Sequence, residues 1–109
     1  MELERMLKAW GEPMRLKIYQ ALLERKHCVR SLSKKFGVSE SAISQHMKVM
    51  RDAGLVSGEK YGYHTHYLPT QEAADFLAAQ FHQMRTASLT VDRDMTVCQC
   101  EYRKEGEHP

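Results

Sequence analysis

The chain has 109 residues, enough for one domain with a hydrophobic core, and its 16 lysines and arginines against 14 acidic residues give a net charge of +2. With 42% hydrophobic residues, the composition is that of a folded domain rather than a disordered chain. No apolar run approaches the roughly 18 residues that span a bilayer, and the N-terminal residues lack the apolar region of a signal peptide. Three cysteines, an odd number, argue against a secreted disulfide framework, so we predict a cytoplasmic protein without a membrane partner.

Basic residues are concentrated in the middle of the chain. Residues 26–60 contain seven lysines and arginines against three acidic residues, whereas residues 70–109 contain four against seven. A basic segment flanked by a mildly acidic C-terminal part is typical of a nucleic-acid-binding module. A solvated helix face of no special function can carry the same charge, so this observation does not assign a function alone.

The hydrophobic spacing predicts five helices and one hairpin. Apolar residues recur at helical spacing in residues 3–10, 13–25, 29–36, 39–53 and 70–88. Pro13 suits the first turn of a helix, Ser39 suits an N-cap, and Gly54 suits the residue after a helix end. Between residues 55 and 68 the apolar and aromatic residues alternate, which predicts a β-hairpin.

The order of these elements predicts a winged helix-turn-helix, mainly α-helical with a β-hairpin wing. Two short helices joined by a turn that contains Gly37 form the helix-turn-helix, and the hairpin follows them. The apolar face of residues 73–84 is wider than a small monomer needs. With the stripe of Leu3, Met6, Leu7 and Trp10, it predicts dimerisation through the terminal helices. We assign residues 1–88 to this domain and residues 89–109 to a C-terminal tail.

Three motifs carry a resemblance to a known family. Residues 39–47 follow the pattern Ser-x-Ser-x-Ile-Ser-x-His-Met, and Ala-Gly-Leu-Val follows at residues 53–56. Residues 13–18 read Pro-Met-Arg-Leu-Lys-Ile, and residues 58–68 form a glycine-centred hairpin that ends in His-Tyr-Leu. Over about residues 5–85 the chain resembles the ArsR/SmtB family of bacterial metal- and stress-sensing repressors. The resemblance implies a homodimer that occupies double-stranded operator DNA and leaves it when an inducer binds.

The resemblance also implies which residues contact DNA. The helix at residues 39–53 carries hydroxyl, amide and ammonium groups opposite its buried stripe, and these can bond base edges or phosphates. His46 lies near the buried stripe and is either a hydrogen-bonding group that positions the helix or a contact to the DNA backbone. Residues of the hairpin are expected at phosphates or in the minor groove. The candidate DNA-binding residues are Ser39, Ser41, Ser44, Gln45, His46, Lys48, Lys60, Tyr61 and His64.

The sensing sites depart from those of the best-known members of the family. One family pattern places Cys-Val-Cys near the start of the third helix, but residues 27–30 read His-Cys-Val-Arg, so the second thiol is replaced by arginine. Another pattern places Asp-x-His and His-x-x-Glu on the last helix. Residues 75–77 (Asp-Phe-Leu) and 82–85 (His-Gln-Met-Arg) match neither half. We therefore expect neither of these two sites to be intact.

Three thiols remain as candidate ligands. Cys98 and Cys100, two residues apart on an extended segment, point the same way and can bind one soft ion. Cys28, from the same chain or from the partner subunit, would complete a trigonal site for an arsenite-like species, cadmium or zinc, and His27 is a conceivable fourth ligand. Thiol redox or electrophile sensing is the alternative, and a DNA-binding module without an effector is another.

No catalytic motif is present in the sequence. There is no glycine-rich phosphate loop, no nucleophile elbow and no His-Glu-x-x-His helix, so we do not expect an enzyme. His64 and His66 lie on the same side of the predicted hairpin. Because they would need further ligands from outside the hairpin, we expect them to face DNA or solvent rather than a metal ion.

Overall fold

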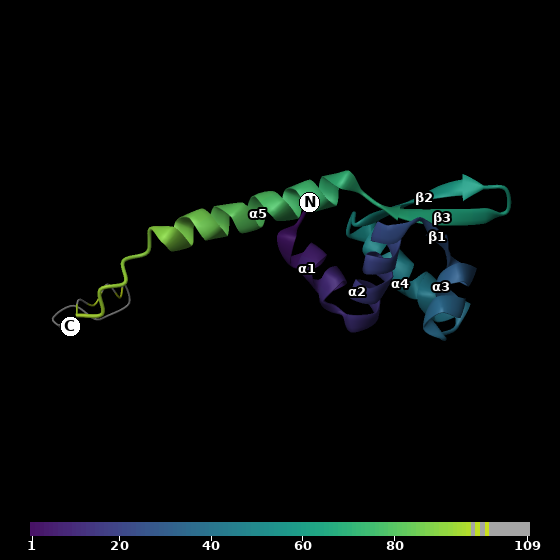
Figure 1. Ribbon diagram of the computed structural model, residues 1–109, viewed down its shortest axis with the longest axis horizontal. Helices are drawn as coiled ribbons and strands as arrows, with labels where there is room; N and C mark the ends of the chain where they lie inside the picture. The colour runs from purple at the N-terminus through teal and green to yellow at the C-terminus, as the bar shows by residue number, and fades with distance from the viewer. Residues whose placement is uncertain (97, 99, 101–109) are drawn as a thin grey trace.

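A computed structural model describes residues 1–96, 98 and 100, and the rest of the predicted tail lies outside the described residues. The chain folds into helices with one small sheet, arranged around a single core (Figure 1). In chain order, the elements are α1 (Leu3–Gly11), α2 (Pro13–Glu24), β1 (His27–Cys28), α3 (Val29–Phe36), α4 (Glu40–Asp52), β2 (Val56–Tyr61), β3 (His64–Pro69) and α5 (Gln71–Leu89). The order agrees with the sequence-based prediction except for β1, which the sequence did not predict.

The ends of α3 and α4, the two helices of the helix-turn-helix, are set by glycines and by a capping serine. Gly37, at the end of α3, has φ +67°, and Gly54, after α4, has φ +82°. Residues with a side chain rarely adopt these left-handed conformations. The Ser39 hydroxyl accepts a hydrogen bond from the backbone N–H of Ala42 at 3.0 Å, which caps α4. The turn therefore fixes where α4 begins relative to α3.

The three strands form one antiparallel sheet with the order β1-β3-β2. His27 lies opposite Tyr67, and Cys28 lies opposite His66, so the start of α3 is tied to the hairpin. At the base of the hairpin, Thr70 donates from its backbone N–H to the Leu55 carbonyl at 3.0 Å. A strand of two residues has no periodicity of its own, which explains why the sequence did not predict β1.

The core is filled by apolar side chains from α1, α2, α3, α4 and the start of the hairpin. Its fully buried large residues are Met6, Ile18, Leu32, Ile43, Met47, Met50 and Leu55. Within the N-terminal stripe predicted for dimerisation, Met6 is 0% and Trp10 only 9% exposed, whereas Leu7 is 38% exposed. The Trp10 ring packs edge-on against Tyr19 with a centroid distance of 5.5 Å. Both residues are therefore part of the protomer's own core.

The fifth helix gives the molecule its elongated shape, with extents of 69 × 23 × 20 Å. Its first half lies beside α1, and its second half projects beyond the rest of the domain, away from the hairpin (Figure 1). Among the described residues, no helix combines the length and the apolar character needed to cross a membrane. The hairpin and the end of α5 thus lie at opposite ends of the chain's fold.

Candidate nucleic-acid interface and cysteine sites

The fourth helix presents a polar face to solvent. Ile43, Met47 and Met50 are at most 1% exposed, which turns the opposite side of the helix outward. The predicted DNA-contacting residues Ser41, Ser44, Gln45 and Lys48 of α4 are all exposed, as is Ser39, the N-cap residue that precedes the helix. Hydroxyl, amide and ammonium groups on one exposed helix face can donate to phosphates and to base edges. The structure therefore brings these five predicted residues together along one helix.

Lys48 is a cationic group of this face, and it has an intrahelical neighbour. Its Nζ lies 3.5 Å from Asp52 Oδ2, and the two side chains are 69% and 43% exposed. An exposed pair of this kind contributes little stability and is readily exchanged for another partner. Lys48 therefore remains available to an anionic ligand.

His46 behaves differently from the other predicted residues of α4. Its side chain is 24% exposed, and Nδ1 faces Glu12 and Arg15 rather than solvent. Arg15 Nη1 lies 3.4 Å from this nitrogen. The His46 side chain thus points from α4 toward the start of α2. Its Nδ1 is not part of the exposed polar face of α4.

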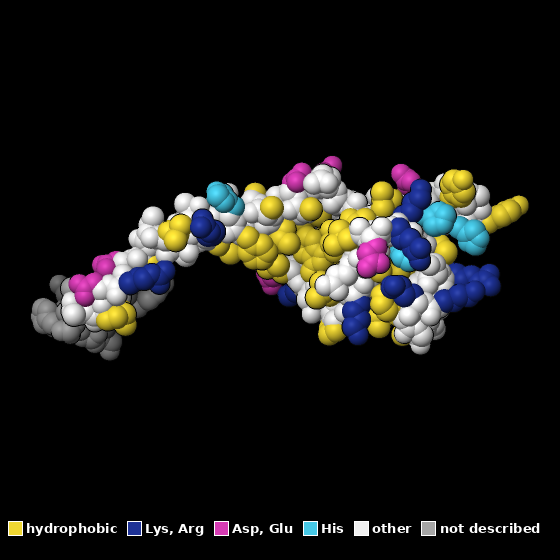
Figure 2. All heavy atoms as spheres, in the orientation of Figure 1, with side chains coloured by type: hydrophobic (Ala, Val, Ile, Leu, Met, Phe, Trp, Pro, Cys, Tyr) yellow, Lys and Arg dark blue, Asp and Glu magenta, His cyan; other side chains and the backbone are white. Residues whose placement is uncertain are grey.

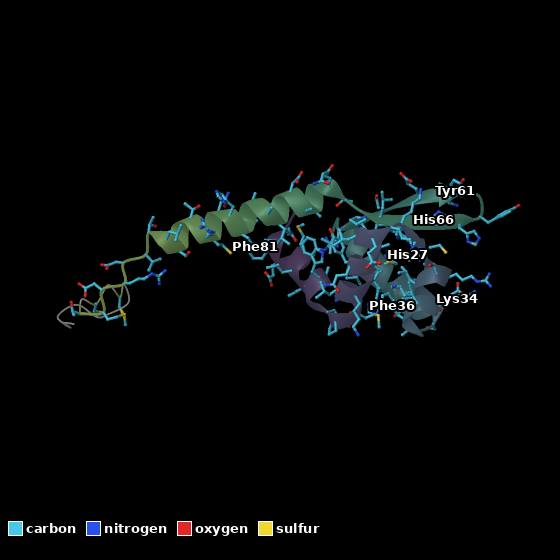
Figure 3. The ribbon with its side chains drawn as sticks, in the orientation of Figure 1. His27, Lys34, Phe36, Tyr61, His66 and Phe81 are labelled. Carbon is cyan, nitrogen blue, oxygen red and sulfur yellow. The ribbon has the colours of Figure 1, made fainter. Side chains whose placement is uncertain are left out.

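The hairpin carries the remaining predicted contacts. Lys60, Tyr61 and His64 are exposed near its turn, and Tyr61 is 72% exposed although its ring lies 5.7 Å from that of His66. Gly62 has φ +65° in the turn, a conformation that glycine adopts without strain. Tyr63, which the sequence analysis did not select, is fully exposed at the tip. The hairpin therefore presents aromatic and basic groups beyond the helical body (Figure 3).

Two basic residues of α3 that were not predicted as DNA contacts lie on the side of the helix that faces the hairpin. Arg30 and Lys34 line a surface hollow of about 360 Å³ together with Cys28, Ser31 and His64. Lysine and arginine side chains gather at this end of the molecule (Figure 2), and Lys34 is labelled there in Figure 3. The basic charge of the segment was visible in the sequence, but the hollow depends on β1, which brings α3 to the hairpin.

The three cysteines do not come together within one chain. Cys28 is half-buried, precedes the first turn of α3 and lines the hollow beside the hairpin. Cys98 and Cys100 follow α5, at the opposite end of the fold (Figure 1). In the part of the chain that the structure describes, no three histidine, cysteine or acidic side chains are placed to hold one metal ion.

The two tail cysteines do contact each other. The backbone N–H of Cys100 donates to Cys98 Sγ at 3.4 Å. Hydrogen bonding with the Cys98 side chain, followed by its charge, raises the pKa of the Cys100 thiol. Two neighbouring thiols suit a soft ion, which binds the thiolate form and displaces the thiol protons.

His27 is not placed as a companion ligand of Cys28. It is 3% exposed, and its Nδ1 lies 2.8 Å from Ser31 Oγ. Burial, followed by the charges of Arg25 and Lys35, lowers the pKa of His27. Consecutive strand residues point to opposite faces, so His27 faces the core while Cys28 faces the surface hollow.

An apolar groove remains open between α1, α2 and α5. Its volume is about 550 Å³, and Phe81 projects from α5 at its edge (Figure 3). The side chains that line it are almost all apolar: Leu7, Trp10, Leu16, Tyr19, Gln20, Leu23, Ala74, Leu77, Ala78 and Phe81. Figure 2 shows the hydrophobic surface gathered beneath the first half of α5. An exposed apolar patch of this kind marks a surface that another protein covers.

Comparisons with known proteins agree with the fold and with a regulatory role. Residues 12–57 match the family model described as "Bacterial regulatory protein, arsR family". The arsenical resistance operon repressor of Bacillus subtilis (strain 168) is 30% identical over 105 residues, covering 95% of this chain and 85% of that protein. The HTH-type transcriptional repressor SmtB of Mycobacterium tuberculosis is 37% identical over 57 residues, which are 52% of this chain and 42% of SmtB.

One solved structure confirms the predicted winged helix-turn-helix. The crystal structure of a possible transcriptional regulator for arsenical resistance superposes with a TM-score of 0.66 and 29% sequence identity. The likeness covers 84% of this chain and 100% of that one. All of these proteins are regulators rather than enzymes, in agreement with the sequence-based expectation.

Proposed function

The chain belongs to the arsR family of bacterial regulatory proteins, and from this premise we propose that it represses transcription as a homodimer bound to operator DNA. The observation that carries the proposal is the polar face of α4, where Ser44, Gln45 and Lys48 are exposed to solvent. Such a helix enters the major groove, while a hairpin beside it contacts the backbone. We expect the protein to act in the cytoplasm, where its thiols stay reduced.

In this proposal, α4 reads bases and the surrounding groups bind phosphates. Gln45 and Ser44 supply hydrogen-bonding groups for base edges, and Lys48 supplies a cation. Lys60, Tyr61 and His64 extend the contact along the hairpin. Arg30 and Lys34 add positive charge where α3 meets the hairpin. Ser39 retains a hydroxyl hydrogen for a phosphate while its oxygen caps α4.

The apolar groove supports the homodimer. A second copy is the occupant that we propose, because the groove joins the terminal helices and continues along α5 in Phe81 and Met84, which are 48% and 49% exposed. A dimer with a two-fold axis places two α4 helices about one DNA turn apart, so that they read an inverted repeat.

The binding experiment starts from a random-sequence pool of DNA duplexes, from which the protein selects its preferred sequence. We expect an inverted repeat, bound by a dimer, with an affinity that falls steeply as salt concentration rises. Recovery of no preferred sequence, or a monomer at micromolar concentration by sedimentation, would contradict the proposal.

We further propose that the inducer is a soft metal or metalloid ion held by cysteine thiolates. Cys98 and Cys100 are two residues apart and in contact, since the backbone N–H of Cys100 donates to Cys98 Sγ at 3.4 Å. Cys28 lies at the start of α3 beside the hairpin rather than beside the tail, so we propose that the tail pair meets Cys28 of the partner subunit. In this arrangement, the second half of α5, which projects beyond its own domain, would carry the tail across the dimer.

A second candidate inducer is an oxidant or an electrophile, and the contact between Cys98 and Cys100 favours it as well. Two neighbouring thiols can be oxidised to a disulfide or alkylated without any metal ion. DNA release measured with arsenite, cadmium, zinc and peroxide distinguishes the two candidates. Release by none of these agents would favour a DNA-binding module without an effector.

A further inference from the structure

Three helices meet at one cluster of charged and imidazole groups. Glu12 precedes α2, Arg15 lies in the first turn of α2, and His46 lies on α4. Arg15 Nη1 is 3.4 Å from His46 Nδ1, and Glu12 Oε2 is 3.7 Å from the same nitrogen. Arg15 is therefore within hydrogen-bond distance of His46 Nδ1, and the Glu12 carboxylate lies beside the same atom as a charged neighbour beyond hydrogen-bond distance.

Arg15 also holds the end of α1. Its Nε donates to the Ala9 carbonyl at 2.8 Å, and its Nη2 donates to the Lys8 carbonyl at 3.3 Å. These carbonyls belong to the last turn of α1, where no intrahelical N–H is available to them. Because the guanidinium group is planar and rigid, the end of α1 and the His46 ring are oriented by the same side chain.

Glu12 is fixed by a bond of its own. Its Oε2 accepts from the backbone N–H of Arg15 at 2.8 Å, which caps α2. This hydrogen bond is the main cause that lowers the pKa of Glu12, and the charges of His46 and Arg15 lower it further. The carboxylate thus stays ionised at neutral pH and remains opposite His46 as an acceptor.

We propose that His46 is a positioning residue of the DNA-reading helix rather than a contact to DNA. Its Nδ1, anchored to Glu12 and Arg15, sets the rotation of α4 against α1 and α2. That rotation of α4 determines the direction in which the neighbouring Gln45 side chain points from the exposed face. Since α1 borders the proposed dimer groove, the cluster also links the dimer interface to the reading of bases. This inference rests on the proposed binding of DNA by α4.

The cluster differs from an ordinary packing contact because it is polar and spans residues 31 positions apart in sequence. Beside it, Ile43 and Met47 already bury the apolar side of α4 completely. Apolar packing holds the helix in the core but tolerates small rotations. Hydrogen bonds with a distance and a direction restrict rotation more tightly, which is what base recognition requires.

Two substitutions of His46 separate positioning from DNA contact. Asparagine places its amide where the imidazole has Nδ1, and glutamine places it where the ring has Nε2. The probes are the duplex that the wild-type chain selects from a random-sequence pool, and the unselected pool itself. The measured quantity is the ratio of the two affinities, with thermal unfolding followed for every variant.

For positioning through Nδ1, His46→Asn should keep the affinity ratio within about threefold of wild type. His46→Gln and His46→Ala should each lower it by about tenfold, with an unchanged dependence on salt. Glu12→Gln should lower the ratio as well, and in the His46→Ala background it should add almost nothing. This non-additivity tests the contact between Glu12 and His46 independently of His46→Asn. It therefore keeps the inference testable if His46→Asn does not fold.

The opposite pattern would overturn the inference. Retention by His46→Gln, loss by His46→Asn and a salt dependence reduced by about one counterion would identify a phosphate contact. Additive effects of Glu12→Gln and His46→Ala would also contradict it. If the wild-type chain selects no duplex at all, the proposed binding of DNA is wrong instead. That result differs from the phosphate-contact pattern and from additive effects, both of which require a selected duplex.

Discussion

The fourth and fifth helices both leave one face uncovered in the protomer, and the two faces differ in chemistry. On α4 the uncovered face is polar, with Ser44, Gln45 and Lys48 exposed. On α5 it is apolar, with Phe81 and Met84 about half exposed. A polar face can exchange its water for base edges and phosphates, whereas an apolar face gains free energy when another protein covers it. The uncovered face, rather than the buried one, indicates the partner.

The cysteines are also divided between two regions of the molecule, the hairpin end and the segment after α5. Cys28 lies next to the hairpin, at the end of the fold where we propose that DNA binds, while Cys98 and Cys100 follow α5. Among the described residues of one chain, the three thiols are not placed to hold one metal ion. The proposed homodimer would allow a shared site if the tail of one protomer reaches Cys28 of the partner subunit.

The largest effect is expected from breaking the apolar face of α5. Phe81→Glu places a charge at the edge of the groove, where the side chain is already 48% exposed in the protomer, so the fold should survive. We expect a monomer by sedimentation and at least about a hundredfold weaker binding to the selected duplex, since two linked half-sites are lost. His82→Glu, an equal change at an exposed residue outside the groove, should stay dimeric. Dimerisation of the Phe81 variant would contradict this role of α5.

The next effect concerns the tail. Replacing Cys98 and Cys100 by serine should leave the DNA affinity of the metal-free protein unchanged and abolish release by arsenite or cadmium. Because coupling between two ligands of a regulator is roughly 1–3 kcal/mol, a response of about 5- to 150-fold should disappear. Release of DNA by the double variant at the original inducer concentration would exclude the tail as the sensor.

Mixed dimers sharpen the same prediction. A Cys28→Ser protomer paired with a Cys98→Ser/Cys100→Ser protomer contains one complete thiol set only if the tail meets Cys28 of the partner subunit. We expect such heterodimers to regain part of the response that either homodimer lacks. A response absent from the heterodimer would contradict the contact with Cys28 of the partner subunit, whereas an intact response in the Cys28→Ser homodimer would show that the tail pair suffices alone.

The pH dependence of metal binding has a defined sign. Thiolates are the ligand form, so the ion displaces the thiol protons when it binds. Since hydrogen bonding with Cys98 raises the pKa of Cys100, that proton stays bound up to a higher pH. The affinity for the ion should therefore increase with pH and decrease in acid, as calorimetry at several pH values can measure. An affinity independent of pH near neutrality would contradict a thiolate site.

Much of the fold could be predicted because the ends of its helices are determined by particular residue types. Gly37 and Gly54 adopt the left-handed conformations expected after helices, and Ser39 caps α4 as predicted. The apolar stripe of α4 follows helical spacing, so its buried side was also correct. In each case the signal lies within a few neighbouring residues of the sequence.

The features that the sequence did not predict depend on contacts between distant residues. Cys28 pairs with His66 across β1 and β3, and no local pattern marks a strand of two residues. His46 meets Arg15 across 31 positions, although each belongs to a motif of the family resemblance. Trp10 packs edge-on against Tyr19 and is only 9% exposed, although both rings also line the apolar groove; helical spacing does not tell how an apolar residue is shared between core and groove.

A smaller effect than dimer loss is expected on the polar face of α4. Gln45→Ala removes an amide that can bond a base edge in two places, so binding to the selected duplex should weaken by roughly 1–3 kcal/mol. Preference should relax at one base position, while binding to random duplexes should change little. Measuring every single-base variant of the selected duplex tests this. Equal losses on selected and random duplexes would exclude Gln45 as a base reader.

The smallest effect concerns Lys48 and its neighbour Asp52. Lys48→Ala should weaken binding to all duplexes alike and reduce the salt dependence by about one counterion, as expected for one lost phosphate contact. Because Asp52 Oδ2 lies 3.5 Å from Lys48 Nζ, the carboxylate competes with phosphate for the ammonium group. Asp52→Asn should therefore strengthen binding slightly, by less than about 1 kcal/mol, since exposed pairs are weak. The same change at Asp75 of α5, outside the DNA-facing surface, should have no effect. If Asp75→Asn strengthens binding equally, net charge rather than release of Lys48 explains the gain.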